Sequence, residues 1–130
     1  MTKTEIINET AKFYNLSNRG YNEDENQCHY LTDDGKKCAV GRCISPEKLI
    51  FFNDLHQNEG VGAVSDLQEF LVEGYAGHSI EFWKDLQIFH DRKRYWDEDG
   101  LTVAGHLEHE VLLARYGRFK DYDALRHDKN

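Results

Sequence analysis

The sequence predicts an α+β fold, a single mainly helical domain over residues 1–130 with about five helices and one small β-hairpin. Apolar residues recur at helical spacing in several segments, and a glycine-containing turn separates two short strand-like segments. One proline and no internal repeat leave nothing that resembles a linker between domains. A chain of this length buries about two thirds of its unfolded surface, so one core is expected to suffice.

The first helix is expected at residues 4–16. Ile7 and Ala11 recur there on one face, which is typical of a helix that packs on a core. Thr2 and Glu5 form a capping-box pattern, in which each side chain satisfies a backbone N–H at the helix start. The following polar residues are expected to form a loop.

Residues 28–40 read as a β-hairpin. Asp33-Asp34-Gly35 supplies the turn, because Gly35 suits the left-handed position that closes a three-residue loop. Successive side chains of a strand point to opposite faces. The face expected to pack on the helices holds Cys28, Tyr30, Cys38 and Val40, and the outer face holds His29, Leu31, Lys37 and Ala39.

Three further helices are expected to begin at Ser45-Pro46, at Ser65 and at Ser79, because serine favours the capping position and proline the first turn. The first of them contains LIFF, residues 49–52, the most hydrophobic run of the chain. In the other two, the residues expected to face the core are Leu67, Phe70, Leu71, Phe82, Trp83, Leu86 and Phe89.

The last long helix is expected at about residues 102–116, with Gly117 as its stop. Its core-facing stripe is predicted to be Val103, Leu107, Val111 and Ala114. The solvent-facing side of this helix is then expected to carry His106, Glu108, His109 and Glu110. Residues 118–130 are mostly charged and are expected to hold one further turn at most before they fray.

The net charge of −8 limits the classes of function. An acidic surface repels phosphate, and the basic run Arg92-Lys93-Arg94 lies close to the acidic run Asp97-Glu98-Asp99, so direct nucleic-acid binding is not expected. No apolar segment has the length of a membrane span or a signal core. The sequence therefore predicts a cytoplasmic protein that does not bind membranes and that keeps its cysteines as free thiols.

Cys28, Cys38 and Cys43 are the only cysteines, in the spacing C-x9-C-x4-C. Structural zinc sites usually present ligands in close pairs such as C-x2-C, so Cys28 and Cys38 are expected to pack as small buried side chains. Cys43 follows Arg42 near a helix start and is the cysteine expected to have a lowered pKa. A zinc site on the three cysteines, with His29 or His56, and a catalytic thiol stay open as alternatives.

His106, His109 and Glu110 lie three and four residues apart on the last helix. Their order, H-x-x-H-E, differs from the H-E-x-x-H and H-x-x-E-H of metalloprotease helices, so metal binding is an alternative to a solvated face. His90-Asp91 ends a helix and is expected to bridge neighbouring elements rather than to form a catalytic dyad. We expect no cofactor.

The segment CHYLTDDGKKCAVGRCISPE, residues 28–47, followed by LQIFHD, residues 86–91, resembles a group of small proteins from bacteria and their phages. In this group a Cys-x-Tyr strand, a glycine turn, a Lys-Cys-Ala-Val-Gly strand and an Ile-Pro-acidic helix start recur, followed by a Leu-Gln-x-x-His-Asp helix. The resemblance implies a small helical protein of microbial or phage origin and transfers no catalytic residue.

The sequence therefore predicts a small acidic protein-interaction module that binds and modulates a host or phage protein, for example as an inhibitor that occupies a basic groove. The alternative is a small metal-dependent or thiol enzyme that uses the cysteines or the His/Glu cluster. The candidate contact residues are two acidic stretches: Glu23, Asp24, Glu25, Asp97, Glu98 and Asp99.

Overall fold

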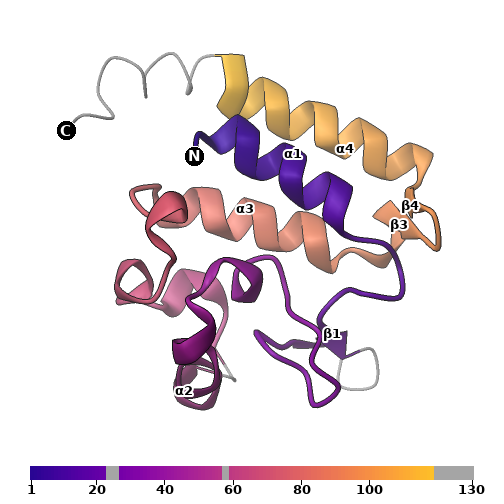
Figure 1. Ribbon diagram of the computed structural model, residues 1–130. Helices are drawn as coiled ribbons and strands as arrows, with labels where there is room; N and C mark the ends of the chain where they lie inside the picture. The colour runs from indigo at the N-terminus through magenta and orange to yellow at the C-terminus, as the bar shows by residue number, and fades with distance from the viewer. Residues whose placement is uncertain (23–26, 57–58, 119–130) are drawn as a thin grey trace.

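The computed structural model describes residues 1–22, 27–56 and 59–118, and it has the predicted α+β class in a single, mainly helical domain (Figure 1). Short 3-10 turns link several of the elements. The helices and strands are α1 (Lys3–Phe13), β1 (Tyr21–Asn22), β2 (Gln27–Cys28), α2 (Pro46–His56), α3 (Ile80–Asp91), β3 (Trp96–Asp97), β4 (Gly100–Leu101) and α4 (Val103–Leu113).

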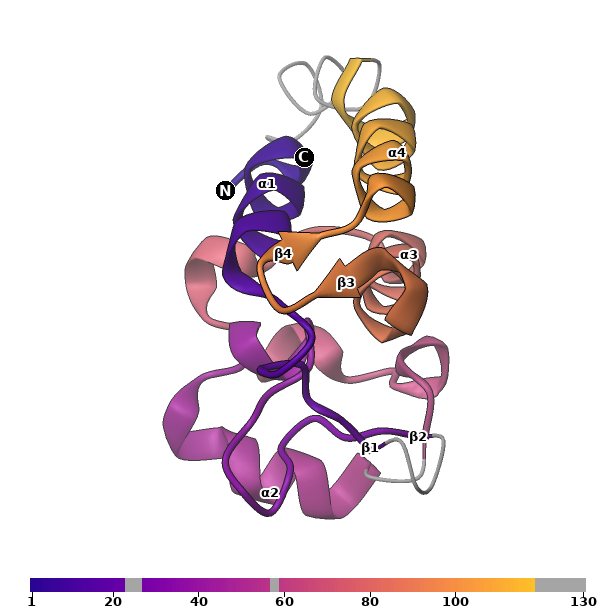
Figure 2. The same ribbon diagram turned by 90° about the vertical axis from the view of Figure 1, so that its right-hand side faces the viewer.

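α3 is the central helix of the upper part of the fold, with α1 and α4 side by side above it (Figures 1 and 2). The predicted inward face of α3 is confirmed, because Phe82, Trp83, Leu86 and Phe89 are all buried. α2 lies at the opposite end of the molecule, beyond the loops that precede and follow it. The helices therefore form two groups, and α2 and α4 mark the two ends.

The predicted helix starts at Thr2, Pro46 and Ser79 are confirmed. Thr2 Oγ1 accepts from the Glu5 N–H at 3.1 Å while Glu5 Oε1 accepts from the Thr2 N–H at 2.8 Å, which completes the capping box of α1. α2 begins at Pro46, and Ser79 Oγ accepts from the N–H of Phe82 at the start of α3. The helix expected from Ser65 is wrong in extent, because only a single 3-10 turn forms, at Leu67–Glu69.

The predicted hairpin over residues 28–40 is confirmed only at its turn. Gly35 has φ of 88°, and Leu31 and Lys37 form one isolated antiparallel bridge. The alternation of faces is wrong at Ala39, which is fully buried together with Cys38 and Val40. The chain then enters a 3-10 turn at Gly41, which ends the extended segment. A Cβ at position 41 would lie 2.0 Å from the Tyr30 carbonyl oxygen, so this close approach requires glycine.

Regular antiparallel pairs form elsewhere, between β1 and β2 and between β3 and β4. In the second pair Trp96 faces Leu101 and Asp97 faces Gly100, which has φ of 128°. The Trp96 indole N–H donates to the Phe89 carbonyl at 3.1 Å and ties this hairpin to α3. The pair leads directly into Thr102, whose Oγ1 caps α4 by accepting from the Gly105 N–H at 3.0 Å.

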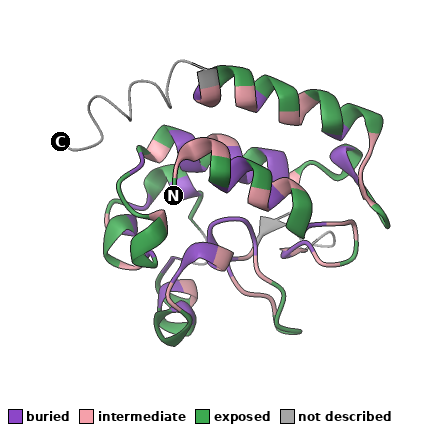
Figure 3. Cartoon of the chain, turned by 45° about the horizontal axis from the view of Figure 1, so that its top comes forward, coloured by how far each residue is buried: buried purple, intermediate pink, exposed green. Residues whose placement is uncertain are grey.

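The predicted core stripe of α4 is wrong. Val103, Leu107 and Val111 are 79%, 64% and 46% exposed, and Ala114 is exposed as well, so the outer side of α4 is apolar. Figure 3 shows that much of this helix is exposed. The buried side carries Gly105, Leu112 and, one turn beyond the helix, Tyr116. The α-helix ends at Leu113 and a π-helical turn follows at Ala114–Arg118, so Gly117 lies inside a turn rather than at a stop.

Candidate functional site

The two cysteines whose side chains the structure describes, Cys38 and Cys43, are free thiols in the core. The expectation of a lowered pKa at Cys43 is wrong, because burial raises the pKa of this thiol to about 12 despite the charge of Arg42. A protonated, fully buried sulfur is a poor nucleophile and a poor metal ligand. The side chain of Cys28 lies outside the described part.

Arg42 binds Glu9 rather than activating its neighbour. Its Nη1 donates to Glu9 Oε1 at 2.6 Å, and the same oxygen accepts from the Tyr75 hydroxyl. The guanidinium lies over the Phe13 and Tyr75 rings, 5.3 and 5.8 Å from their centroids. Burial alone would raise the pKa of Glu9, but the hydrogen bonds from Tyr75 and Arg42 outweigh it and lower this pKa. The cluster fastens α1 to the segments that flank α2.

His90 and Asp91 bridge elements, as predicted. His90 is fully buried; its Nε2 accepts from the Gly20 N–H at 3.2 Å, so the ring proton lies on Nδ1, 2.7 Å from Asp91 Oδ1. Gln87 Nε2 also donates to Asp91 at 2.8 Å. Burial lowers the pKa of His90. Both ring nitrogens are occupied, so His90 has no lone pair to offer a substrate.

The His/Glu cluster lies along a hollow of about 580 Å³ between α1 and α4. His109 is half-buried and its Nε2 lies 2.8 Å from Asn8 Oδ1, so this ring faces α1 rather than solvent. Burial lowers the pKa of His109. His106 and Glu110 are exposed, as expected for a solvated face. In residues 1–22, 27–56 and 59–118 no group of three His, Cys, Asp or Glu side chains is placed to hold a metal ion.

The acidic stretch Asp97-Glu98-Asp99 forms the exposed turn between β3 and β4. Asp97 Oδ1 accepts from the Asp99 N–H at 2.8 Å, and Glu98 accepts from the Ser17 hydroxyl. The first contact stabilises the turn, and the second fastens the hairpin to the chain that follows α1. The other predicted stretch, Glu23-Asp24-Glu25, lies outside the described residues.

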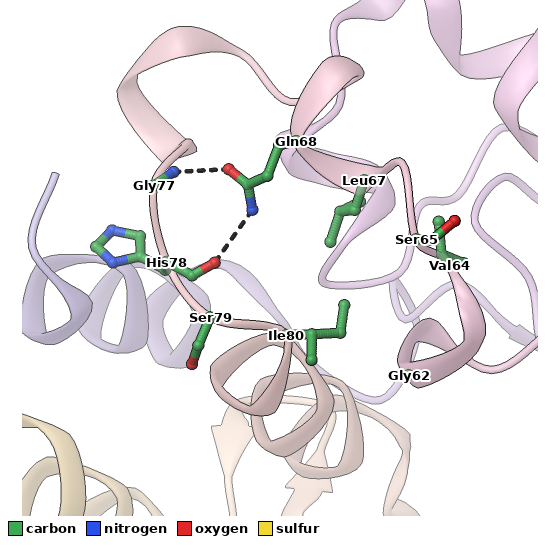
Figure 4. Close-up of a pocket in the computed structure, with 9 residues that line it drawn as sticks. All are labelled: Gly62, Val64, Ser65, Leu67, Gln68, Gly77, His78, Ser79 and Ile80. Atoms are coloured by element: carbon green, nitrogen blue, oxygen red, sulfur yellow. Dashed lines mark hydrogen bonds between the residues drawn. The ribbon is translucent and has the colours of Figure 1, made fainter.

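A hollow of about 610 Å³ lies between the 3-10 turns and the start of α3 (Figure 4). Gln68 crosses it, accepting from the Gly77 N–H at 2.7 Å and donating to the His78 carbonyl at 3.1 Å. The His78 ring and the Ser79 hydroxyl point away from the space beside Leu67. Gln68 therefore serves to hold the loop before α3, and the lining carries no charged side chain suited to catalysis.

α2 exposes apolar side chains on its outer side. Ile50, Phe51 and Leu55 are 67%, 62% and 51% exposed, while Leu49 and Phe52 on the opposite side are buried. Phe51 stacks on Phe70, whose ring centroid lies 6.2 Å away. We call Ile50, Phe51, Leu55 and Phe70 the α2 surface.

Acidic side chains lie among and beside the apolar residues of the α2 surface. Residues 44–75 carry six Asp or Glu and a single Lys. Glu47 and Asp54 are exposed on the helix itself, and exposed Glu69 lies beside its first turn, where Lys48 Nζ donates to the Glu69 carbonyl at 3.3 Å. Glu47 and Asp54 each stand three or four residues from both Ile50 and Phe51, so they lie between these two side chains on the helix. We call Glu47, Asp54 and Glu69 the acidic rim of the α2 surface.

The outer side of α4 gives a second apolar patch, which we call the α4 surface: Val103, Ala104, Leu107, Val111 and Ala114. Its surroundings differ in charge, because residues 92–118 carry five Lys or Arg and five Asp or Glu. The two surfaces lie at opposite ends of the molecule (Figures 1 and 2). Contiguous exposed apolar residues of this kind mark interaction sites more often than isolated ones do.

A scan against protein-family models and searches of curated proteins and of solved structures give no match to this chain. Among the helices of the described ranges, none combines the length and the hydropathy that a bilayer span requires. The two apolar surfaces and their charges are therefore what the chain offers as evidence of function.

Proposed function

We propose that this protein is an interaction module that binds a partner protein through the α2 surface, and that the contact region of the partner is basic. The observation that carries the proposal is the exposure of Ile50, Phe51 and Leu55 on one side of a helix. Large apolar and aromatic side chains at the centre of an interface supply most of its binding free energy. Phe51, stacked on Phe70, is the expected anchor.

The rim supports a basic partner. Glu47, Asp54 and Glu69 flank the apolar side chains, and opposite charges on a partner would steer the encounter and fix its orientation. A second copy of the chain would instead bring two acidic rims together, which opposes self-association at this surface. A basic groove that accepts α2 satisfies both the apolar and the charged features.

The enzyme alternative has less support. Cys38 and Cys43 are buried, the His90 nitrogens are occupied, and His109 faces Asn8. These arrangements hold elements together, and none of these four side chains is an exposed nucleophile beside a base. The resemblance to bacterial and phage proteins leads us to propose a host or phage protein as the partner, whose activity this module would modulate.

The test begins with a photo-crosslinking residue at position 51 and a matched one at position 107, which lies on the α4 surface. A protein captured from bacterial lysate at position 51 and not at position 107 is purified and its binding is measured directly. Phe51→Ser and Leu55→Ser should each weaken binding about 30-fold, which corresponds to a hot-spot cost of about 2 kcal/mol.

Leu107→Ser is the control and should leave the affinity for that protein unchanged. A partner whose binding survives Phe51→Ser, or whose contact region is acidic, would contradict the proposal. Turnover of a small substrate that survives purification and is lost on His106→Ala or Cys43→Ala would favour the enzyme alternative.

A further inference from the structure

α4 presents the pattern of a short coiled-coil seam on its solvent side. Ala104, Leu107, Val111 and Ala114 follow one another at spacings of three, four and three residues, the spacing of alternating a and d positions. All four are exposed. Val at an a position with Leu at a d position favours two-stranded association.

The remaining heptad positions agree with the structure. With Ala104 at a, the b positions are Gly105 and Leu112 and the f position is His109, and these residues face the body of the protein. The seam is thus on the side that the domain leaves uncovered. From this geometry we infer that two copies of the chain associate by packing their α4 surfaces against each other.

The charges beside the seam complement a second copy. Glu110 occupies a g position and Arg115 the e position that follows it, and pairs of g and e residues form salt bridges between parallel helices. The Arg115 side chain is 51% exposed although Nη1 lies 3.0 Å from Asp85 Oδ2, so it has room for a second carboxylate. Two α4 helices side by side in parallel would form the Glu110–Arg115 pair twice.

The balance of charge also distinguishes the two ends of the molecule. Five basic and five acidic residues in 92–118 give this end no formal net charge, so two copies can approach each other here without the repulsion that the α2 rim would produce. Self-association through α4 leaves both α2 surfaces free. A dimer would then carry two partner sites, and its affinity for a clustered partner would exceed that of one site.

The helix is already folded before it associates. Gly105, Leu112 and Tyr116 hold α4 on the domain, so the cost of helix nucleation, which makes isolated helices of this length marginal, does not oppose dimer formation. The seam itself is short, since α4 has 11 residues. A seam of about two heptads buries less than a standard interface, and the association is expected to be reversible and concentration-dependent.

Sedimentation velocity over a dilution series of the full chain measures this association. The wild type should shift from monomer towards dimer as concentration rises. Leu107→Glu should remain monomeric, and its melting temperature should be unchanged because Leu107 is exposed and not part of the core. Phe51→Ser, the matched change on the α2 surface, should dimerise like the wild type. If Phe51→Ser abolishes association instead, the contact joins α2 to α4 head to tail and the inference is wrong.

Charge reversal tests the pairing. Glu110→Arg and Arg115→Glu should each dissociate more readily than the wild type, at least threefold, while their equimolar mixture should recover the wild-type midpoint, because each variant then faces its opposite charge. A mixture that stays monomeric would overturn the parallel pairing. A wild-type chain that is monomeric throughout the series would overturn self-association and leave the α2 proposal intact, since that proposal is measured by partner binding.

Discussion

Gly105 lies directly against the backbone carbonyl of Tyr95, and a Cβ at position 105 would stand 2.1 Å from that oxygen. This close approach fixes the side on which α4 meets the domain. It is the reason that Leu107, two positions along the helix, points to solvent. The orientation of α4 thus depends more on the absence of a side chain at Gly105 than on the apolar stripe of the helix.

Gly105→Ala is therefore expected to destabilise the protein by about 1–3 kcal/mol, the range for overpacking a close contact. Elsewhere in a helix the same change stabilises by up to about 1 kcal/mol, so the sign of the effect is diagnostic. Urea unfolding measures it, with Gly60→Ala as the control because no atom lies within 4 Å of a Cβ there. A stabilised Gly105→Ala variant would show that α4 can move away from the Tyr95 carbonyl at little cost in free energy.

The thiols give a second prediction. In a Cys28→Ser background, Cys38 and Cys43 should react with a thiol reagent only on the timescale of unfolding and should both react at once in denaturant. Burial and the pKa of about 12 at Cys43 act in the same direction. Stoichiometric native labelling within the mixing time would mean that the core around these residues is open.

The Glu9–Arg42 pair is expected to contribute more than a surface ion pair. The Arg42 side chain is 13% exposed, and Arg42→Met should cost about 1.5–3 kcal/mol, the range for hydrogen bonds to charged groups. Arg115→Met removes the more exposed Asp85 pair and should cost about 0.2–1 kcal/mol. A double-mutant cycle with Glu9→Gln isolates the coupling, which should be clearly favourable at pH 7.

The direction in which pH changes the contribution of this pair to stability follows from the lowered pKa of Glu9. A carboxyl group whose folded pKa lies below its unfolded value contributes stability above the unfolded value, about 4.3, and loses it as pH falls through the folded value. The coupling should therefore fade in acid. A coupling that persists at pH 2 would assign the effect to packing of the arginine on Phe13 and Tyr75.

His90 makes stability depend on pH near neutrality. Burial lowers its folded pKa below the unfolded value of about 6.5, so the unfolded chain binds the extra proton first. Stability should be complete above this value and fall as pH decreases below it, by at most about 1.4 kcal/mol per pH unit for one group. Denaturation midpoints between pH 7 and pH 5 measure the slope.

His90→Asn should lower stability at pH 7 and reduce that slope. His109→Asn is the control: burial lowers the pKa of His109 in the same direction, but this ring is only half-buried, so most of the slope should remain. An unchanged slope in His90→Asn would place the titrating group elsewhere.

Helix caps and turns were the features of this fold that the sequence predicted well. The capping residues Thr2 and Ser79 and the turn at Gly35 depend on neighbours within a few residues. The apolar stripe Val103, Leu107 and Val111 predicted the wrong buried side of α4, because such a stripe does not indicate whether the core of the same domain covers it. The contact between Gly105 and Tyr95 determines which side of α4 faces the domain, and it joins separate elements, so helical periodicity does not predict it.

The α2 surface was not predicted from the sequence, for a related reason. LIFF at residues 49–52 places apolar side chains on both sides of a helix, and one turn of chain gives no indication of which side the rest of the fold will cover. Leu49 and Phe52 turn inward, and Ile50 and Phe51 are left outside. The acidic rim becomes visible only when Glu69 is brought beside the first turn of α2.

The rim of the α2 surface supplies the last prediction, on the rate of partner binding. Neutralising Glu47, Asp54 and Glu69 together with Gln or Asn should slow association about tenfold at low salt and leave dissociation nearly unchanged. The difference should shrink as salt rises, because the field of exposed charges reaches only about 8 Å at physiological ionic strength. Stopped-flow mixing with the partner captured at position 51 measures both rates. Matched neutralisation of Glu23-Asp24-Glu25 and of Asp97-Glu98-Asp99 tests the other two acidic stretches, and a larger slowing in either variant would move the steering surface from α2 to that stretch.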